Sequence, residues 1–181
     1  MSMALQIEPR TRAALHALPD DGCRHELIDG EHIVTPAPSR LHQRVVLRLY
    51  EALREHVAAH RLGELAWSPA DLALGDDEVL QPDLFLVPPA LMQTARWEDI
   101  SALTLVAEVV SPSSARTDRQ AKRLRYQRAG VPHYWIVDPE QQQVEVWHPD
   151  SAAGEVWRGR LVWPVPSEAS LVIDLDALFA V

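Results

Sequence analysis

The stretch from Leu103 to Val110 restricts the fold more than any other part of the sequence. It is apolar apart from Thr104 and Glu108, and its length and content of valine and leucine predict a buried β-strand. An ionised carboxylate in such a strand costs several kcal/mol unless a cation or a metal ion compensates it. A second acid, Asp83, directly precedes the apolar residues Leu84 to Val87. The fold must therefore accommodate two acids beside a hydrophobic core.

Helices and strands are expected to alternate along the chain. A short helix is expected near residues 11–17, and a hairpin over residues 24–35 turns at Asp29-Gly30. Ser39 is a suitable cap for a long helix to about His60, with Gly63 as its stop. A capping box of Thr117 and Gln120 predicts another helix that ends at Gly130. Further strands are expected near residues 71–74, 79–87, 103–110, 133–138, 143–148, 155–163 and 171–175. The class is α/β, with a mixed β-sheet flanked by helices.

Composition favours a single cytoplasmic domain over residues 1–181. The chain is 47% hydrophobic and 24% charged, which is typical of an ordinary globular domain. Residues 1–10 contain no apolar run of signal-peptide length, and no later stretch is apolar enough to span a membrane. Cys23 is the one cysteine, so no internal disulfide can form, and we expect it to be a small core residue.

The positive charge is concentrated in one segment. The formal net charge is −9, which argues against a protein that coats nucleic acid, but residues 116–128 contain six cations and one acid, a local charge of +5. Of the 17 basic residues in the chain, 16 are arginine and one is Lys122, within this segment. A chain so biased toward arginine suggests that this position needs a compact ammonium group. An ordinary surface lysine is the alternative.

Asp83, Glu108 and Lys122 together predict a metal-dependent hydrolytic site. If the two acids lie on neighbouring strands and point to the same face, they form an oxygen site suited to magnesium. Lys122, early in the next helix, could then reach back toward the site. Phosphodiester hydrolysis needs an activated water and a positive group near the developing charge, and these residues can supply both. Taken alone, Asp83 could instead bind nearby backbone amides, and Glu108 could form a buried salt bridge with an arginine.

Several segments resemble the Uma family of restriction-type endonucleases, which belongs to the PD-(D/E)XK nuclease superfamily. The resemblance covers residues 24–148, and its order and spacing are specific although each motif alone is weak. It rests on the segments Glu26-Leu-Ile-Asp-Gly30, His42, Gln81-Pro-Asp83, Glu108-Val-Val-Ser-Pro-Ser113, Asp118 with Lys122, and Gly130-Val-Pro-His-Tyr-Trp-Ile-Val-Asp-Pro139.

The resemblance implies a restriction-endonuclease-like sheet flanked by helices, with Asp83 and Glu108 as the ligands of Mg²⁺ or Mn²⁺. The superfamily lysine usually lies two residues after the second acid, where this chain has Val110. Lys122 matches related proteins in which the lysine has moved to the following helix. It would orient or activate the attacking water, so that Asp83, Glu108 and Lys122 are the expected catalytic residues.

Other residues are weaker candidates. Arg119 and Arg123 flank Lys122 on the helix and could hold DNA phosphates, although plain solvation is an equal alternative. Glu26 matches an acid of the family and could complete the metal shell, but it lies in an alternating strand where a surface role is as natural. His42 shares a helical stripe with apolar residues, which favours a hydrogen-bonded core histidine. Tyr126, one turn after Lys122, is expected to contribute packing.

Three functions remain open from the sequence. The first, which we prefer, is a magnesium-dependent endonuclease that hydrolyses DNA, expected to be a homodimer because two strands must be cut. The second is a binding module that keeps the nuclease fold without turnover. The third is a metal-dependent hydrolase of a smaller phosphoester, for which a closed pocket rather than a groove is expected.

Overall fold

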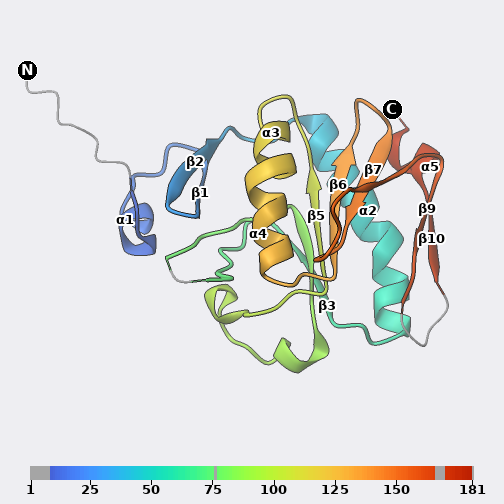
Figure 1. Ribbon diagram of the computed structural model, residues 1–181, viewed down its shortest axis with the longest axis horizontal. Helices are drawn as coiled ribbons and strands as arrows, with labels where there is room; N and C mark the ends of the chain where they lie inside the picture. Colours follow the sequence, from blue (N-terminus) through green and yellow to red (C-terminus); the bar gives the residue numbers. More distant parts are fainter. Residues whose placement is uncertain (1–8, 76, 166–169, 181) are drawn as a thin grey trace, which may run out of the picture.

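A six-stranded sheet runs through the centre of the computed structural model, which describes residues 9–75, 77–165 and 170–180 (Figure 1). Most of residues 1–10, on which the expectation of a missing signal peptide rests, lie outside these ranges. The sheet contains β3 (Glu64–Trp67), β4 (Leu84–Val87), β5 (Leu105–Val109), β6 (His133–Asp138), β7 (Gln143–Trp147) and β8 (Glu155–Trp157). Two further pairs are β1 (Arg24–Ile28) with β2 (Glu31–Thr35), and β9 (Arg160–Trp163) with β10 (Leu171–Asp174).

The strands follow chain order from β3 to β8, and all neighbours are antiparallel except β5 and β6. A parallel pair requires a crossover, because the chain must return to the same end of the sheet. The arginine-rich helical segment supplies this crossover. It consists of α3 (Ala115–Thr117), a π-helical turn (Asp118–Lys122) and α4 (Arg123–Arg128). The carboxyl end of β5 therefore leads directly into the segment that carries the lone lysine.

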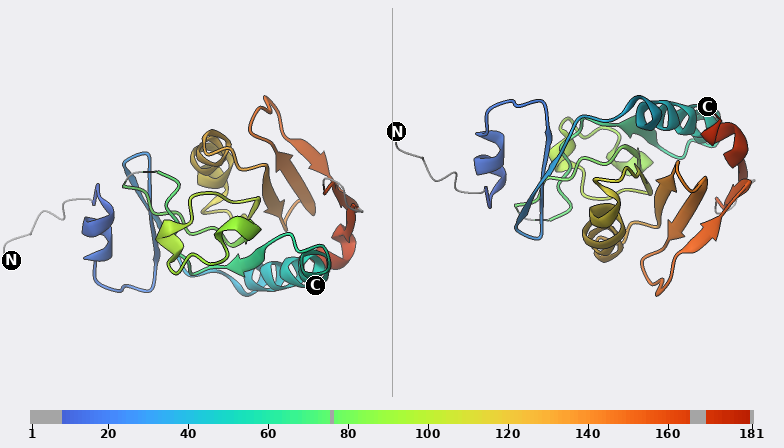
Figure 2. Two further views of the ribbon diagram at one scale, coloured as in Figure 1. Left: turned by 90° about the horizontal axis from the view of Figure 1, so that it is seen from below. Right: turned by 90° about the horizontal axis from the view of Figure 1, so that it is seen from above.

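Helices cover the two faces of the sheet (Figure 2). The long helix α2 (Arg40–Ala59) lies on one face, and α4 lies on the other. Short helices α1 (Arg12–His16) and α5 (Leu175–Phe179) and two 3-10 turns (Pro89–Leu91 and Trp97–Asp99) complete the described elements. The expectation of a mixed sheet flanked by helices is confirmed. No helix in the described ranges is both long and apolar enough to cross a membrane.

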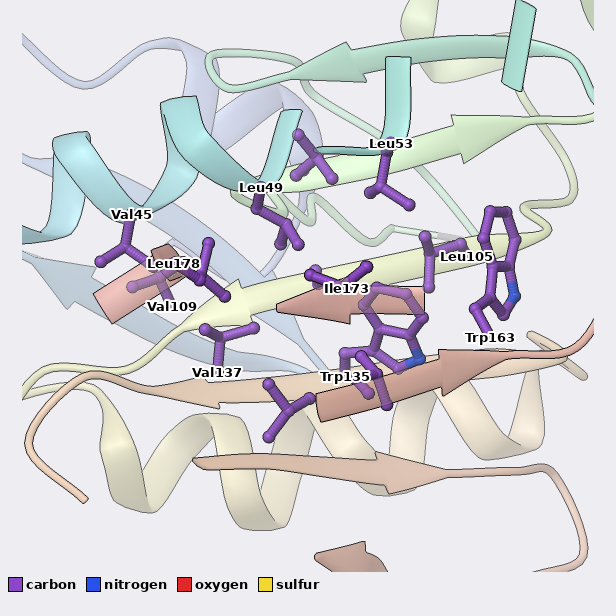
Figure 3. Packing of buried hydrophobic residues seen from close by; sticks show 14 of the residues in the cluster. Val45, Leu49, Leu53, Leu105, Val109, Trp135, Val137, Trp163, Ile173 and Leu178 are labelled. Carbon is purple, nitrogen blue, oxygen red and sulfur yellow. The ribbon is translucent and has the colours of Figure 1, made fainter. Parts of the chain in front are cut away.

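Helix α2 forms where its cap and apolar spacing predict it. The Ser39 side chain accepts a hydrogen bond from the backbone N–H of His42, and Val45, Leu49 and Leu53 are fully buried. Figure 3 shows these three side chains pointing from the helix toward the sheet. Each buried leucine contributes about 2 kcal/mol through apolar burial. This packing fixes the first turn of α2 relative to the ends of β4 and β5.

The expected stop of α2 was wrong in detail. Arg61, with φ of 52°, adopts the left-handed conformation after the helix, and the Leu62 N–H donates to the Val57 carbonyl. Gly63 has another role, since a β-carbon at this position would lie 1.9 Å from the carbonyl oxygen of Val87. The glycine therefore permits close contact between β3 and β4 rather than ending the helix.

The arginine-rich helix also starts differently from expectation. Helical hydrogen bonding begins at Ala115, and Thr117 has helical backbone angles without a side-chain cap, so the expected capping box is absent. The segment contains a π-helical turn over residues 118–122, which the sequence pattern did not predict. Such turns contain an extra residue and are frequent at functional sites.

Three smaller expectations were corrected. The strand expected over residues 79–87 is broken at Pro82, which has no N–H for a ladder, so that β4 begins only at Leu84. The strand expected to end at residue 74 is reduced to one bridge, between Leu72 and Leu80. Cys23 is exposed rather than part of the core.

Candidate active site

Asp83 and Glu108 lie side by side at one end of the sheet. The register of β4 and β5 pairs Leu84 with Ala107, so that one residue further Asp83 faces Glu108. The Asp83 N–H donates to Glu108 Oε2 over 3.4 Å, and the Val109 N–H donates to Asp83 Oδ2 over 2.8 Å. Opposed residues on antiparallel strands project to the same face, which brings these two acids together. Both side chains are buried.

Lys122 reaches the same place from the π-helical turn. Its Nζ lies 3.0 Å from Glu108 Oε1, 2.9 Å from Glu26 Oε1 and 3.8 Å from Asp118 Oδ1. The residue is only 2% exposed, so its ammonium is compensated by carboxylates rather than by solvent. The structure thus brings together the three residues expected to be catalytic.

Glu26 lies inside this cluster rather than at the surface. It is 1% exposed, and its Oε1 accepts a hydrogen bond from the Gln81 backbone N–H over 2.8 Å. A bridge between Leu27 and Val79 attaches strand β1 to the segment that precedes β4, which carries Glu26 inward. The alternation in β1 could not indicate which of its faces is buried.

Asp83 has two cationic or titratable partners that the sequence did not identify. Arg24 Nη2 lies 2.8 Å from Asp83 Oδ1, and His42 Nε2 lies 2.9 Å from Asp83 Oδ2. His42 is partly buried and hydrogen-bonded as expected, but its partner is a candidate catalytic acid. Arg24 could have been found, because residues two apart on a strand share a face and it precedes Glu26 by two.

Two tyrosine hydroxyls donate hydrogen bonds to residues in the group of buried acids around Lys122. The Tyr126 hydroxyl donates to Glu108 Oε1 over 3.2 Å, and the Tyr134 hydroxyl donates to the Asp118 carbonyl over 2.9 Å. Both rings are buried, with their centroids 4.9 Å apart. Tyr126 therefore packs as expected, and it also orients a carboxylate of the site.

A cavity of about 150 Å³ opens onto these side chains. The first turn of α2, the approach to it from β2, and the segment that joins β5 to the π-helical turn form its walls. The residues that line it are Arg24, Thr35, Pro36, Ala37, Pro38, Ser39, His42, Asp83, Glu108, Ser111, Ser113, Ser114, Thr117, Asp118 and Lys122. A small ligand in the cavity could contact both acids and the lysine.

The cluster contains more buried acid than cation. Four carboxylates, from Glu26, Asp83, Glu108 and Asp118, lie near two permanent cations, Lys122 and Arg24. Burial raises the pKa of Glu108 well above its usual range although Lys122 opposes this, and it raises the pKa of Asp118 to about 6.

Asp83 and Lys122, in contrast, remain charged. Burial opposes ionisation of Asp83, but the hydrogen bond and charge of His42, with Arg24, lower its pKa to about 2. Burial likewise opposes the charge of Lys122, but the surrounding carboxylates, with Glu108 first, raise its pKa. The site therefore combines ionised Asp83 and a protonated ammonium with two acids that resist ionisation.

This donor set fits a magnesium ion that keeps part of its water. Among the described residues, no group of three or more histidine, cysteine, aspartate or glutamate side chains forms a preformed cage. Magnesium needs no such cage, because it usually retains several waters and binds one or two carboxylates. A cation beside Asp83 and Glu108 would also offset the excess of buried acid, which favours their ionised forms.

Arg119 and Arg123 lie outside the cavity lining and have other partners. Arg119 Nη2 lies 2.7 Å from Asp138 Oδ2, and its Nε lies 2.8 Å from Glu145 Oε1. Arg123 donates to the Arg119 carbonyl and packs its guanidinium over the Trp147 ring, 4.5 Å from the centroid. Contact with phosphates by these arginines stays a prediction.

Comparisons with known proteins agree with the fold. A solved structure, described as a "putative nuclease belonging to DUF820 from Anabaena variabilis ATCC 29413", matches with a TM-score of 0.77 and 23% identity, covering 95% of this chain and 98% of that chain. No curated protein matches. A family described as "Putative restriction endonuclease" matches residues 12–175. Because these residues make up most of the chain, the protein belongs to this family, Uma2.

Proposed function

We propose that this protein is a magnesium-dependent endonuclease that hydrolyses phosphodiester bonds of DNA. One observation carries the proposal, namely that Asp83, Glu108 and Lys122 meet at a single cavity although they are separated by up to 39 positions in the sequence. Membership of the Uma2 family and the fold shared with a solved nuclease-like structure support it.

In this proposal Asp83 and Glu108 hold the ion. Magnesium is preferred because the donors are hard carboxylate oxygens, and Mn²⁺ suits the same set. When bound, the ion supplies positive charge beside the scissile phosphate and makes a water more acidic. His42 and Arg24 keep the Asp83 carboxylate ionised and fix its orientation, as outer partners of metal ligands do.

Lys122 acts as a charged donor in this proposal. Its raised pKa keeps the ammonium protonated, so it does not remove a proton from water. It orients the attacking water through a hydrogen bond and stabilises the negative charge that develops on the phosphate. Glu26, an accessory residue, accepts from Lys122 and fixes the direction of the ammonium.

Two features of the proposal lie outside the cavity. Arg119 and Arg123 contact backbone phosphates through the N–H groups that their present partners leave unused. The protein acts as a homodimer, because cutting both strands of a duplex at one place requires two sites. Sedimentation of the protein in solution tests this second feature.

Cleavage assays on three substrates test the proposed activity. Supercoiled plasmid, single-stranded DNA and RNA are incubated with Mg²⁺, Mn²⁺ or a chelator. We expect metal-dependent cleavage of DNA by the wild type and its loss in Asp83→Asn, Glu108→Gln and Lys122→Met. Glu78→Gln is the matched control, since Glu78 is a buried, cation-paired acid outside the cavity lining.

Each outcome of the cleavage assays supports or contradicts one of the three candidate functions. Cleavage that survives all three substitutions contradicts the proposed site. Folded wild type that cleaves none of the polymers also contradicts the proposal, and hydrolysis of a small phosphodiester would then identify the substrate as a smaller phosphoester. If that is absent too, the protein is a binding module with a nuclease fold. Thermal unfolding of each variant separates loss of chemistry from loss of structure.

A further inference from the structure

A second concave surface lies beside the proposed site, on the solvent side of α2. This groove has a volume of about 530 Å³ and is lined by residues of α2 and by Trp67 at the end of β3. Its lining residues are Arg40, Gln43, Arg44, Val46, Leu47, Tyr50 and Trp67. Trp67 and Leu47 are each 56% exposed, although large apolar side chains are usually covered.

The groove and the cavity of the proposed site meet neighbouring residues of the first turn of α2. Ser39 and His42 line the cavity, while Arg40 and Gln43, on the same first turn of α2, line the groove. Trp67 pairs with Leu84, the residue after Asp83, and adjacent strands are about 5 Å apart. The next residue, Ser68, donates its N–H to the Asp83 carbonyl over 3.3 Å. Trp67 and Asp83 project to opposite faces of the sheet, so a polymer reaches the groove from the cavity by passing around the end of the sheet at the first turn of α2.

The charge of the groove favours an anion. Its lining includes two arginines and no acid, in a chain whose net charge is −9. Within the part of the chain that the structure describes, neither Arg40 nor Arg44 forms an ion pair, whereas Arg24, Arg119 and Arg125 all do. Arg40, in the first turn of α2, is also disfavoured there by the helix dipole.

Trp67 offers a flat apolar surface to solvent. Its ring packs edge-on against Tyr50, with centroids 5.0 Å apart at 70°, so the indole is held in place while part of it stays open. An aromatic side chain beside positive groups is the arrangement that binds single-stranded nucleic acid, with bases stacked on rings and phosphates held by cations. A base in a duplex cannot stack in this way, because its faces are covered by neighbouring bases.

We propose that this groove binds a single-stranded segment of DNA adjacent to the scissile phosphate. An unpaired base stacks on Trp67, and Arg40 and Arg44 hold the phosphates that flank it. This inference rests on the proposed nuclease function and narrows its substrate to DNA that is unpaired beside the cut, such as a flap, a loop or a single strand.

Binding without cleavage tests the inference. Fluorescence anisotropy with a labelled 12-nucleotide single strand, and with the duplex of the same sequence, is measured in chelator. We expect tighter binding of the single strand, weakened about tenfold or more by Trp67→Ala and restored in part by Trp67→Phe. Trp97→Ala is the matched control, because Trp97 is 38% exposed and lies outside this groove.

The arginines are tested through salt dependence. Each phosphate contact on a single strand contributes about 0.7 to the slope of log K against log salt. Arg40→Gln and Arg44→Gln should each lower the slope by about this amount. Arg54→Gln, an exposed arginine further along the same helix, should leave the slope unchanged.

Three results would overturn the inference. The first is equal affinity of wild type and Trp67→Ala for the single strand, and the second is binding of duplex at least as tight as that of the single strand. The third is a dimer that dissociates in Trp67→Ala with oligonucleotide affinity unchanged, which assigns the groove to a second copy of the chain. Plasmid cleavage is scored separately, so strand binding through Trp67 without cleavage supports the groove while contradicting the nuclease proposal.

Discussion

Lys122 and Arg125 lie three residues apart on one helical segment, and both are buried cations paired with acids. Their surroundings nevertheless differ. Lys122 lies within 3.0 Å of two carboxylate oxygens and 3.8 Å from a third, and it lines a cavity. Among the described residues, Arg125 forms an ion pair with Glu78 alone, donates to the Leu74 carbonyl, and does not line that cavity.

The difference separates a structural pair from a site. The charges of Arg125 and Glu78 balance, and together they attach the loop before β4 to α4. Around Lys122 the acids outnumber the cations beside a cavity, and burial, together with the neighbouring acids, raises the pKa values of Glu108 and Asp118. A protein keeps such an arrangement at a cost in stability, and perturbed groups of this kind concentrate where chemistry occurs.

The largest expected difference is in activity. Lys122→Met should lower the rate of DNA cleavage by roughly 10²- to 10³-fold, the range for loss of a donor that stabilises charge in the transition state. Arg125→Met should instead lower the free energy of unfolding by about 3–5 kcal/mol, because it leaves Glu78 buried and unpaired. Cleavage rate per folded molecule and urea unfolding measure the two effects.

The comparison fails if both substitutions act alike. A folded Arg125→Met variant that is as inactive as Lys122→Met would show that the pair is part of the catalytic apparatus. Lys122→Arg sharpens the test, because it keeps the charge but replaces a compact ammonium with a larger planar group. We expect it to remain inactive.

Metal binding should raise the free energy of unfolding through the acids near Lys122 and not through the Arg125–Glu78 pair. At a Mg²⁺ concentration 100 times its dissociation constant, wild type should gain about 2.7 kcal/mol of unfolding free energy. Asp83→Asn should lose most of this gain, and Glu78→Gln should retain it. Thermal unfolding with Mg²⁺ and with chelator gives the values, and a gain that persists in Asp83→Asn would place the ion elsewhere.

The pH dependence of stability should reflect the burial of Asp118, which raises the pKa of this carboxyl. The folded pKa of Asp118, about 6, exceeds the ordinary value of 3.8, so the folded state binds the extra proton and stability falls as pH rises between these values. This shift corresponds to about 3 kcal/mol. In chelator, wild type should lose about this much more than Asp118→Asn between pH 4 and pH 8.

Asp83 is a control, because its effect on the pH dependence of stability has the opposite sign to that of Asp118. Its folded pKa of about 2 lies below the ordinary value, so its contribution is present above pH 4 and disappears as pH falls toward 2. Asp83→Asn should therefore flatten the acid side of the curve and leave the fall above pH 4 intact. If the free energy of unfolding depends on pH in the same way in wild type and in Asp118→Asn, the pKa of Asp118 is not raised in the folded state.

The sequence predicted much of this site because its strongest signals are local. Asp83 and Glu108 each interrupt an apolar strand, and Lys122 is the one lysine in the chain, so each is conspicuous without knowledge of the fold. The burial of Glu26 depends instead on how β1 attaches to residues before β4. His42 reaches Asp83 only because α2 packs across the sheet. Such contacts are set by tertiary packing, which no local pattern contains.

The π-helical turn is a similar case. Thr117 and Gln120 have the spacing of a capping box, yet the helix begins earlier and gains an extra residue before Lys122. The sequence pattern contains no signal for this extra residue, and Lys122, at the end of the π-helical turn, reaches the carboxylates of Glu26 and Glu108. The sequence predicted a mixed sheet but not the order of its six strands. The parallel pairing of β5 with β6 depends on the folded crossover between them, which no local pattern describes.

A smaller effect is expected where a histidine only orients an acid. His42→Gln should lower activity about 10- to 100-fold, as loss of an outer partner of a metal ligand does, with an increased requirement for Mg²⁺. His16→Gln is the matched control, since His16 pairs with Asp71 in an exposed position. Cleavage rates over a Mg²⁺ titration distinguish the variants, and a flat response in His42→Gln would reduce this histidine to packing.

Arg119 is expected to give the smallest effect, because most of its guanidinium is already occupied by Asp138 and Glu145. If its remaining N–H groups contact one phosphate, Arg119→Gln should weaken DNA binding uniformly across sequences and reduce the salt slope by about 1. Arg158→Gln is the control. Arg158 directly follows β8, and it donates a hydrogen bond to the Gln143 side chain. Anisotropy titrations at several salt concentrations measure both. An unchanged slope in Arg119→Gln would leave this arginine in the same class as Arg125, a cation that serves the fold rather than the substrate.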